Sequence, residues 1–146
     1  MSVDLAALKS EIQNDPAGLG LAPFVATGNN GEIAYRLNQI VSGSSVTREF
    51  ITAPELQGAL DATEFTAFNA AFMSRWQAIL MTTMSSLPIN TGNLKAQLLA
   101  MFPNAVGTSA SRTSLIALQT KQGTRAEVLF GDGTVISTDD VYRALL

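Results

Sequence analysis

The sequence contains no cysteine and no histidine. Without cysteine the chain cannot form disulfides or thiolate metal sites, so nothing supports a secreted, disulfide-stapled scaffold. Without histidine it lacks the commonest general base and the commonest transition-metal ligand. Charge is scarce as well, since charged residues make up 14% of the 146 residues against about a quarter in an ordinary domain. We therefore expect no enzyme, no cofactor and a surface that partners partly cover.

Membrane and nucleic-acid binding are also disfavoured. The first residues, MSVDLAALKSEIQ, form an amphipathic helical pattern with an early acid rather than a signal peptide. The most apolar stretch is interrupted by polar residues, so we predict no membrane span and synthesis in the cytoplasm. The net charge is −3, which makes free nucleic acid an unsuitable ligand.

The stretch Asp61–Met84 is predicted to be a long central helix around which the rest of the chain folds. Its main apolar face has helical spacing and consists of Phe65, Phe68, Phe72, Trp76 and Ile79. A second line of small side chains should let a neighbouring helix approach closely; it consists of Ala67, Ala71, Ser74, Ala78 and Thr82. A helix that is apolar nearly all round is expected to be packed on several sides.

The remaining segments also predict helices. They are Ser2–Asn14, Gly31–Val41, Thr52–Leu60, Thr91–Phe102, Ser109–Lys121, Arg125–Phe130 and Thr138–Leu146. Capping boxes are expected at Thr52 with Glu55 and at Thr124 with Glu127. Val46–Ile51 reads as a brief extended run, and Thr134–Ser137 as a short β-like run near the C-terminus. The prediction is an all-α fold, a single helical domain over residues 1–146 with seven to eight helices and long loops.

Pairs of acids are the main candidates for chemistry. Asp61 with Glu64, and Asp139 with Asp140, could serve acid–base catalysis, but both pairs begin helices, where carboxylates are favoured for capping alone. Asp132 with the second pair could hold Ca²⁺ or Mg²⁺, yet the spacing is not that of an EF-hand loop. We predict neither a catalytic residue nor a metal site.

Two segments, together with the central aromatic helix, carry a resemblance to small structural proteins of tailed bacteriophages. The first is LKSEIQNDPAGLGLAPFVATGNNGEIAYRLN, with a helix, Asp15-Pro16, a Gly18-x-Gly20 turn and a short helix ending in Leu37-Asn38. The second is RAEVLFG at Arg125–Gly131, followed by GTVISTDDVYRAL. The chain departs from that pattern at Gly20-Leu21, where many such proteins place an aromatic. The resemblance is one of turns and core positions, with no catalytic signature.

The resemblance implies a head–tail connector, or adaptor, in the neck of the virion. Such a subunit forms a homo-oligomeric ring that joins the portal protein to a tail-side neck protein, with DNA only as passing cargo. An acidic balance suits a DNA conduit because it repels phosphate, and a ring needs two different faces on each subunit. Other classes stay open: a capsid decoration protein, a tail-completion protein, or a small phage-encoded inhibitor of a host protein.

Three segments are predicted to contact partners: Asp15–Gly31, Ser42–Thr52 and Gly131–Leu146. The first two hold more apolar material than a solvated loop needs. The last ends in a helix of barely two turns, which is too short to be stable without something to pack on. Arg112 and Arg125 lie in a region poor in charge. They either contact acidic residues of a partner or lie at the surface near helix ends. By the resemblance Val141–Leu146 docks on the portal; alternatively this helix closes the subunit's own core. The predicted interface residues are Leu19, Leu21, Phe24, Val46, Arg48, Phe50, Ile51, Arg112, Arg125, Val141, Tyr142, Leu145 and Leu146.

Overall fold

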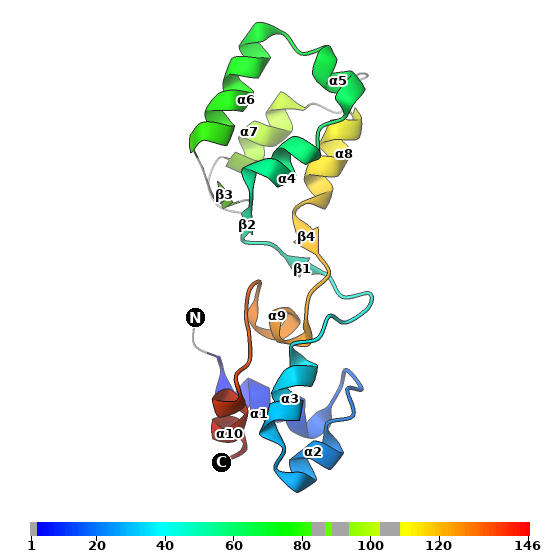
Figure 1. The fold of residues 1–146 in the computed structure, drawn as a ribbon, viewed down its shortest axis with the longest axis vertical. Coiled ribbons are helices and arrows are strands. Elements are labelled where there is room, and N and C mark those ends of the chain that lie inside the picture. Colours follow the sequence, from blue (N-terminus) through cyan, green and yellow to red (C-terminus); the bar gives the residue numbers. More distant parts are fainter. Residues whose placement is uncertain (1–2, 83–86, 89–93, 103–108) are drawn as a thin grey trace. The chain divides into compact units, whose positions relative to one another are not determined.

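The structure, a computed structural model, describes residues 3–82, 87–88, 94–102 and 109–146. It is mostly helical, with 61% helix in ten helices among the described residues, which confirms the all-α prediction in its coarse form. No described helix is long and apolar enough to cross a membrane. The contacts of the chain divide it into two compact units (Figure 1). We call residues 1–46 and 122–146 the terminal unit, and residues 47–121 the middle unit.

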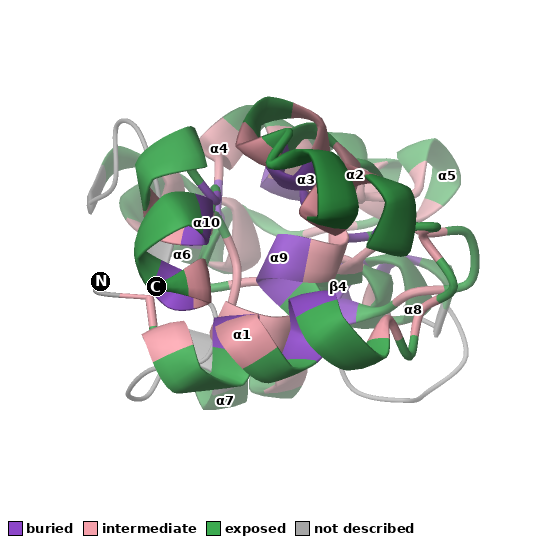
Figure 2. Ribbon diagram, turned by 90° about the horizontal axis from the view of Figure 1, so that it is seen from below, coloured by how far each residue is buried: buried purple, intermediate pink, exposed green. Residues whose placement is uncertain are grey.

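The terminal unit is built from five helices. They are α1 (Leu5–Asn14), α2 (Ala22–Thr27), α3 (Asn30–Leu37), α9 (Arg125–Phe130) and α10 (Thr138–Leu145). Helix α10 packs against α1 and α3, and α9 contacts α3. Figure 2 shows that α1, α3, α9 and α10 combine buried residues with exposed ones, whereas α2 has no buried residue. The buried cluster consists of Leu8, Ile12, Leu21, Ile33, Ala34, Leu37, Ala126, Ile136, Val141 and Ala144.

Local signals place most of these helices correctly. Asp4 caps α1 by accepting from the backbone of Ala6 and Ala7. The capping box of Thr124 with Glu127 is confirmed at the start of α9. Helix α10 begins at Thr138 as predicted, and its cap is Ser137, in a capping box with Asp140. The predicted long loop after Asp15 also contains the short helix α2, which has a proline in its first turn and ends at a left-handed glycine, Gly28.

The β-like run predicted at Thr134–Ser137 is not a strand in the structure. The side chain of Asn38 takes the place of a neighbouring strand. Its Nδ2 donates to the carbonyl oxygen of Ile136 (2.8 Å), and its Oδ1 accepts from the amide of the same residue (2.9 Å). One amide side chain thus satisfies both backbone groups, so this extended segment needs no β-partner there.

Within its described residues the middle unit contains five helices and three short strands. The helices are α4 (Ala53–Gly58), α5 (Ala62–Thr66), α6 (Ala70–Thr82), α7 (Leu94–Met101) and α8 (Ser109–Ala117). The strands are β2 (Phe50–Ile51), β3 (Leu87–Pro88) and β4 (Thr120–Lys121); β2 pairs antiparallel with β3, Phe50 opposite Pro88. The capping box of Thr52 with Glu55 begins α4 as predicted. The helix predicted to reach Lys121 ends at Ala117, since the chain then enters β4. The buried cluster consists of Ile51, Leu56, Trp76, Leu98, Phe102 and Leu115.

The long helix predicted over Asp61–Met84 is interrupted. Helix α5 ends at Thr66, and α6 begins after Asn69, whose side-chain oxygen accepts from the amide of Phe72 at 2.9 Å. An asparagine in this role caps a new helix, which competes with continuing the old one. The break still lets the rings of Phe68 and Phe72 stack, with centroids 3.9 Å apart. Met84 lies outside the described residues.

Only one side of α6 is buried. Trp76 is 1% exposed and meets Phe102 edge to face with centroids 5.7 Å apart, and Phe72 meets the same ring at 5.2 Å. The small residues predicted to receive another helix are exposed at Ala71, Ser74 and Ala78. The expectation of a helix covered on several sides, at the centre of one core, is therefore wrong: the described residues form two separate apolar clusters, and α6 contributes to one of them.

The chain passes between the two units at β1 (Val46–Thr47) and at β4, and these strands pair. On the terminal side, Ser44 Oγ donates to the carbonyl of Gly123 (2.8 Å) and accepts from its amide (3.0 Å). A Cβ at Gly123 would collide with the side chain of Val46, so glycine permits the close approach. That residues 1–146 form a single domain stays a prediction. An experiment described in the Discussion asks whether the two units unfold together.

Candidate interaction surfaces

The predicted binding loop after α1 is held to the terminal unit by its first acid. Asp15 adopts a left-handed backbone (φ 42°), and its carboxylate accepts from the amides of Leu19 (2.7 Å), Gly20 (2.7 Å) and Leu21 (3.1 Å). Leu21 is fully buried and Leu19 is half-buried. This loop is therefore a packed structural element, and its apolar residues mainly serve the unit's own core.

Arg36 of α3 reinforces the same loop. Its Nη1 donates to the carbonyl of Leu19 (2.6 Å), its Nε pairs with Glu32 (2.9 Å), and its guanidinium lies 4.5 Å from the ring centroid of Phe24. Phe24 is half-buried under this cation. The predicted interface residues Leu19, Leu21 and Phe24 are thus brought together, but by contacts within the unit.

The predicted interface residues of Ser42–Thr52 divide between core and surface. Val46 is 5% exposed and Ile51 is fully buried. Arg48 donates from Nη2 to both carboxylate oxygens of Glu55, at 2.8 and 3.1 Å. Hydrogen bonding by the Thr52 backbone is the main cause that holds the pKa of Glu55 below its usual value. Phe50 is half exposed and stays available for contact.

Arg112 and Arg125 both have partners within the chain. Arg112 Nη1 donates to the carbonyls of Leu99 and Phe102, each at 2.7 Å, and so caps the C-terminal end of α7. Arg125 makes a two-pronged pair with Glu11 of α1, from Nε (2.6 Å) and from Nη2 (2.9 Å). The Glu11 side chain is 4% exposed, and the hydrogen bond raises the pKa of Arg125. Both arginines therefore make their contacts within the chain.

Helix α10 presents an inner and an outer face. Val141 is fully buried and Leu145 is half-buried against the terminal cluster. Tyr142 is 53% exposed and Leu146 is 80% exposed. The inner face closes the unit's own core, and the outer face is exposed. Docking of this helix on the portal stays a prediction.

The acid pairs act at helix starts. Asp61 caps α5, and the carboxylate of Glu64 accepts from the amides of Ala110 and Ser111, each at 2.9 Å, at the start of α8. The Ser111 hydroxyl lowers the pKa of Glu64, and the Ser137 hydroxyl likewise lowers that of Asp140. No group of three acidic side chains that could hold a metal ion occurs within the described ranges.

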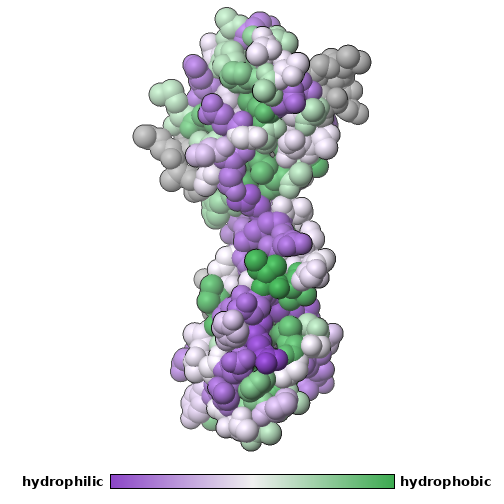
Figure 3. Space-filling model, turned by 45° about the vertical axis from the view of Figure 1, so that its right-hand side comes forward, coloured by the Kyte–Doolittle hydropathy of each residue, from purple (hydrophilic) through white to green (hydrophobic). Residues whose placement is uncertain are grey.

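Further exposed apolar side chains lie at positions that the interface prediction missed. Figure 3 shows apolar side chains reaching the surface at several places. In the terminal unit they are Tyr35, Ile40, Val128 and Val135, and in the middle unit Met81 and Ile116. Tyr35 does not lie on the apolar face of α3 that carries Ile33 and Leu37. Its position outside that helical spacing is the signal in the sequence that indicates exposure.

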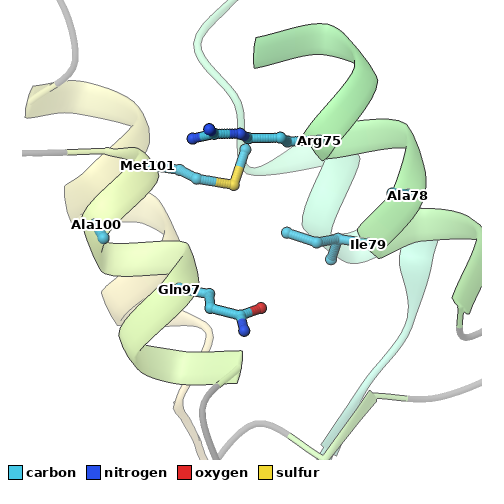
Figure 4. A pocket seen from close by; sticks show the side chains of 6 residues that line it. All are labelled: Arg75, Ala78, Ile79, Gln97, Ala100 and Met101. Atoms are coloured by element: carbon cyan, nitrogen blue, oxygen red, sulfur yellow. The ribbon is translucent and has the colours of Figure 1, made fainter. Parts of the chain in front are cut away.

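The middle unit has a groove of about 500 Å³ between α6 and α7. In Figure 4 the side chains of Arg75 and Ile79 extend from α6, and those of Gln97 and Met101 from α7, into the space between the helices. Ala78 and Ala100 complete the described lining. The described lining is apolar apart from one cation, Arg75, and one amide, Gln97.

No family model, curated protein or solved structure matches this chain.

Proposed function

We propose that this chain is a structural subunit of a bacteriophage head–tail connector ring, which joins the portal vertex to the tail and forms part of the DNA conduit. The observation that carries the proposal is that the two units present different surfaces. The terminal unit exposes the outer face of α10, and the middle unit exposes the α6–α7 groove. A closed ring is built by head-to-tail contacts, which need two different surfaces on every subunit.

The residues that carry the phage resemblance support the proposal because they have defined backbone roles. Gly18 and Gly20 have φ of 67° and 71°, a region that side chains disfavour. The Asp15 carboxylate accepts hydrogen bonds from the loop amides, and the Asn38 side chain hydrogen-bonds both backbone groups of Ile136. Arg125 pairs with Glu11 across α9 and α1. The shared pattern therefore specifies how the terminal unit folds.

The other partners follow from the same proposal. The portal protein would contact one end of the ring and a tail-side neck protein the other, in the neck of the virion. The net charge of −3 favours passage of DNA over its retention.

Imaging of virions that carry this chain with a small added epitope tests the proposal. We expect label and ring-shaped density at the neck, and co-purification with the portal protein. Label distributed over the capsid would instead indicate a decoration protein. Absence of the chain from purified virions, with capture of a host protein in infected cells, would indicate the inhibitor alternative.

A further inference from the structure

The groove between α6 and α7 carries an uncompensated positive charge. Arg75 is exposed, and among the described residues it takes part in no ion pair or hydrogen bond. No acidic residue is among the described residues that line the groove, and Gln97 adds an amide on the opposite helix. The floor is apolar, from Ile79 and Met101. The complementary ligand has a carboxylate next to apolar side chains.

The outer face of α10 has this composition. Asp139, Tyr142 and Leu146 are spaced i, i+3 and i+7, so they lie on one face of the helix. The side chain of Asp139 is 74% exposed and lies 4.0 Å from Arg143, its nearest cation, in a loose surface pair. Tyr142 and Leu146 are exposed apolar side chains beside it.

The dimensions of the two surfaces also agree. Helices α7 and α10 each have eight residues, a length of about 12 Å at 1.5 Å per residue. An amphipathic helix that lays apolar residues at this spacing into a groove between helices is a common recognition mode. The inner face of α10 stays on its own core through Val141 and Ala144, so docking requires no unfolding.

We propose that the α6–α7 groove binds the outer face of α10 from a second copy of this chain, with Asp139 paired to Arg75 and with Tyr142 and Leu146 on the apolar floor. Groove and helix are different surfaces, so the contact is head-to-tail and repeats from copy to copy. This inference rests on the proposed ring and identifies its subunit contact.

Disulfide trapping tests the contact directly, because the natural chain has no cysteine. The full chain carrying both Gln97→Cys and Tyr142→Cys is oxidised and run on a denaturing gel without reductant. We expect a ladder of covalent oligomers, because each copy supplies one partner for each neighbour. Each single variant gives at most a dimer, and a mixture of the two singles gives the mixed dimer. The matched control, Gln97→Cys with Tyr35→Cys, gives no ladder.

Charge exchange provides a second readout by sedimentation velocity over a range of concentrations. Arg75→Asp and Asp139→Arg should each weaken self-association at least about tenfold, and the double variant should recover most of it. Gln77→Glu on α6 and Thr138→Lys on α10 are controls on neighbouring exposed positions and should have little effect. Circular dichroism verifies that each variant is folded.

The inference is overturned by a disulfide closed within one chain, by a chain that stays monomeric at all concentrations, or by a double variant no better than the singles. The proposed function fails separately. If a ring at the neck persists with each single charge reversal, the contact proposed here is wrong but the connector function stands. If the chain self-associates through this contact but is absent from the neck, the connector function is wrong but the contact stands.

Discussion

The terminal and middle units are held together by different kinds of contact. In the terminal unit polar side chains join segments that are distant in sequence: Arg125 binds Glu11, 114 residues away, and Asn38 binds Ile136, 98 residues away. In the middle unit polar contacts such as that of Glu64 with Ala110 are joined by an aromatic cluster, which consists of Phe68, Phe72 and Trp76 around Phe102. Directional bonds fix one arrangement of segments, whereas ring packing buries large areas with looser geometry.

The difference extends to unsatisfied groups. Trp76 Nε1 is a buried donor without a hydrogen-bond partner among the described residues, in the same helix that lines the open groove. Such a group costs stability unless water or another acceptor reaches it. We infer that the terminal unit is the more precisely specified of the two, and the middle unit the one more readily reshaped by a partner.

The largest test of this comparison is Trp76→Ala. Removing the central ring of the aromatic cluster should lower the free energy of unfolding by about 3–5 kcal/mol. Hydrogen exchange read by mass spectrometry should show the lost protection within residues 47–121. Equal loss of protection in both units would mean that the chain unfolds as the single domain predicted from the sequence.

The corresponding change in the terminal unit is Arg125→Ala. It leaves the carboxylate of Glu11, 4% exposed, without its partner, and should cost about 3 kcal/mol in chemical denaturation. The control is Glu11→Leu with Arg125→Met, which removes both charges and should recover much of the stability. A double variant as unstable as Arg125→Ala would show that the packing of the stems, and not the charge, is what matters.

A smaller effect is expected at Asn38. Asn38→Ala leaves both backbone groups of Ile136 unpaired and should cost about 1–3 kcal/mol. Asn38→Asp retains the acceptor but loses the donor, and should fall between alanine and the natural residue at neutral pH. If the two variants melt at the same temperature, the bond that Asn38 accepts from the Ile136 amide does not contribute to stability on its own.

The smallest effect is a loss of stability in acid, which each unit should show. Hydrogen bonding holds the pKa values of Glu55 and Glu64 of the middle unit, and of Asp140 of the terminal unit, below their ordinary values. Their stabilisation is complete above the ordinary values and is lost as pH falls through the lowered ones. Fluorescence of Trp76, the only tryptophan, reports on the middle unit, and Tyr35 and Tyr142, the only tyrosines, on the terminal unit. A unit whose stability does not fall in acid would contradict the prediction for that unit.

The sequence predicted features that depend on nearby residues. The capping boxes at Thr52 and Thr124 and the aromatic face around Trp76 are confirmed, because a cap or a helical face is decided within a few residues. The break at Asn69 was missed because asparagine in an apolar helical pattern reads as a surface residue. The role of Arg125 was missed for another reason: its partner Glu11 lies on the far side of the sequence, where periodicity carries no information.

The predicted interface shows the same limit. Apolar residues in loops predict partner contacts, but Leu21, Val46 and Ile51 are buried within the chain. The pattern does not single out exposed residues on regular helices, such as Tyr35. Exposure depends on which elements pack together, and this follows from pairings across the whole chain.

The two hydrogen bonds between the Ser44 hydroxyl and the backbone of Gly123 have a consequence for the gene. Because Val46 and Gly123 touch, the segment between them leaves and returns at adjacent points, and a short turn could join Val46 to Gln122 with little loop-closure cost. The middle unit thus has the topology of an insertion, which recombination could exchange at codons 47–121. Such an exchange would keep the contacts of Asp15 and Arg125 in the terminal unit and replace the middle unit by a module of different size.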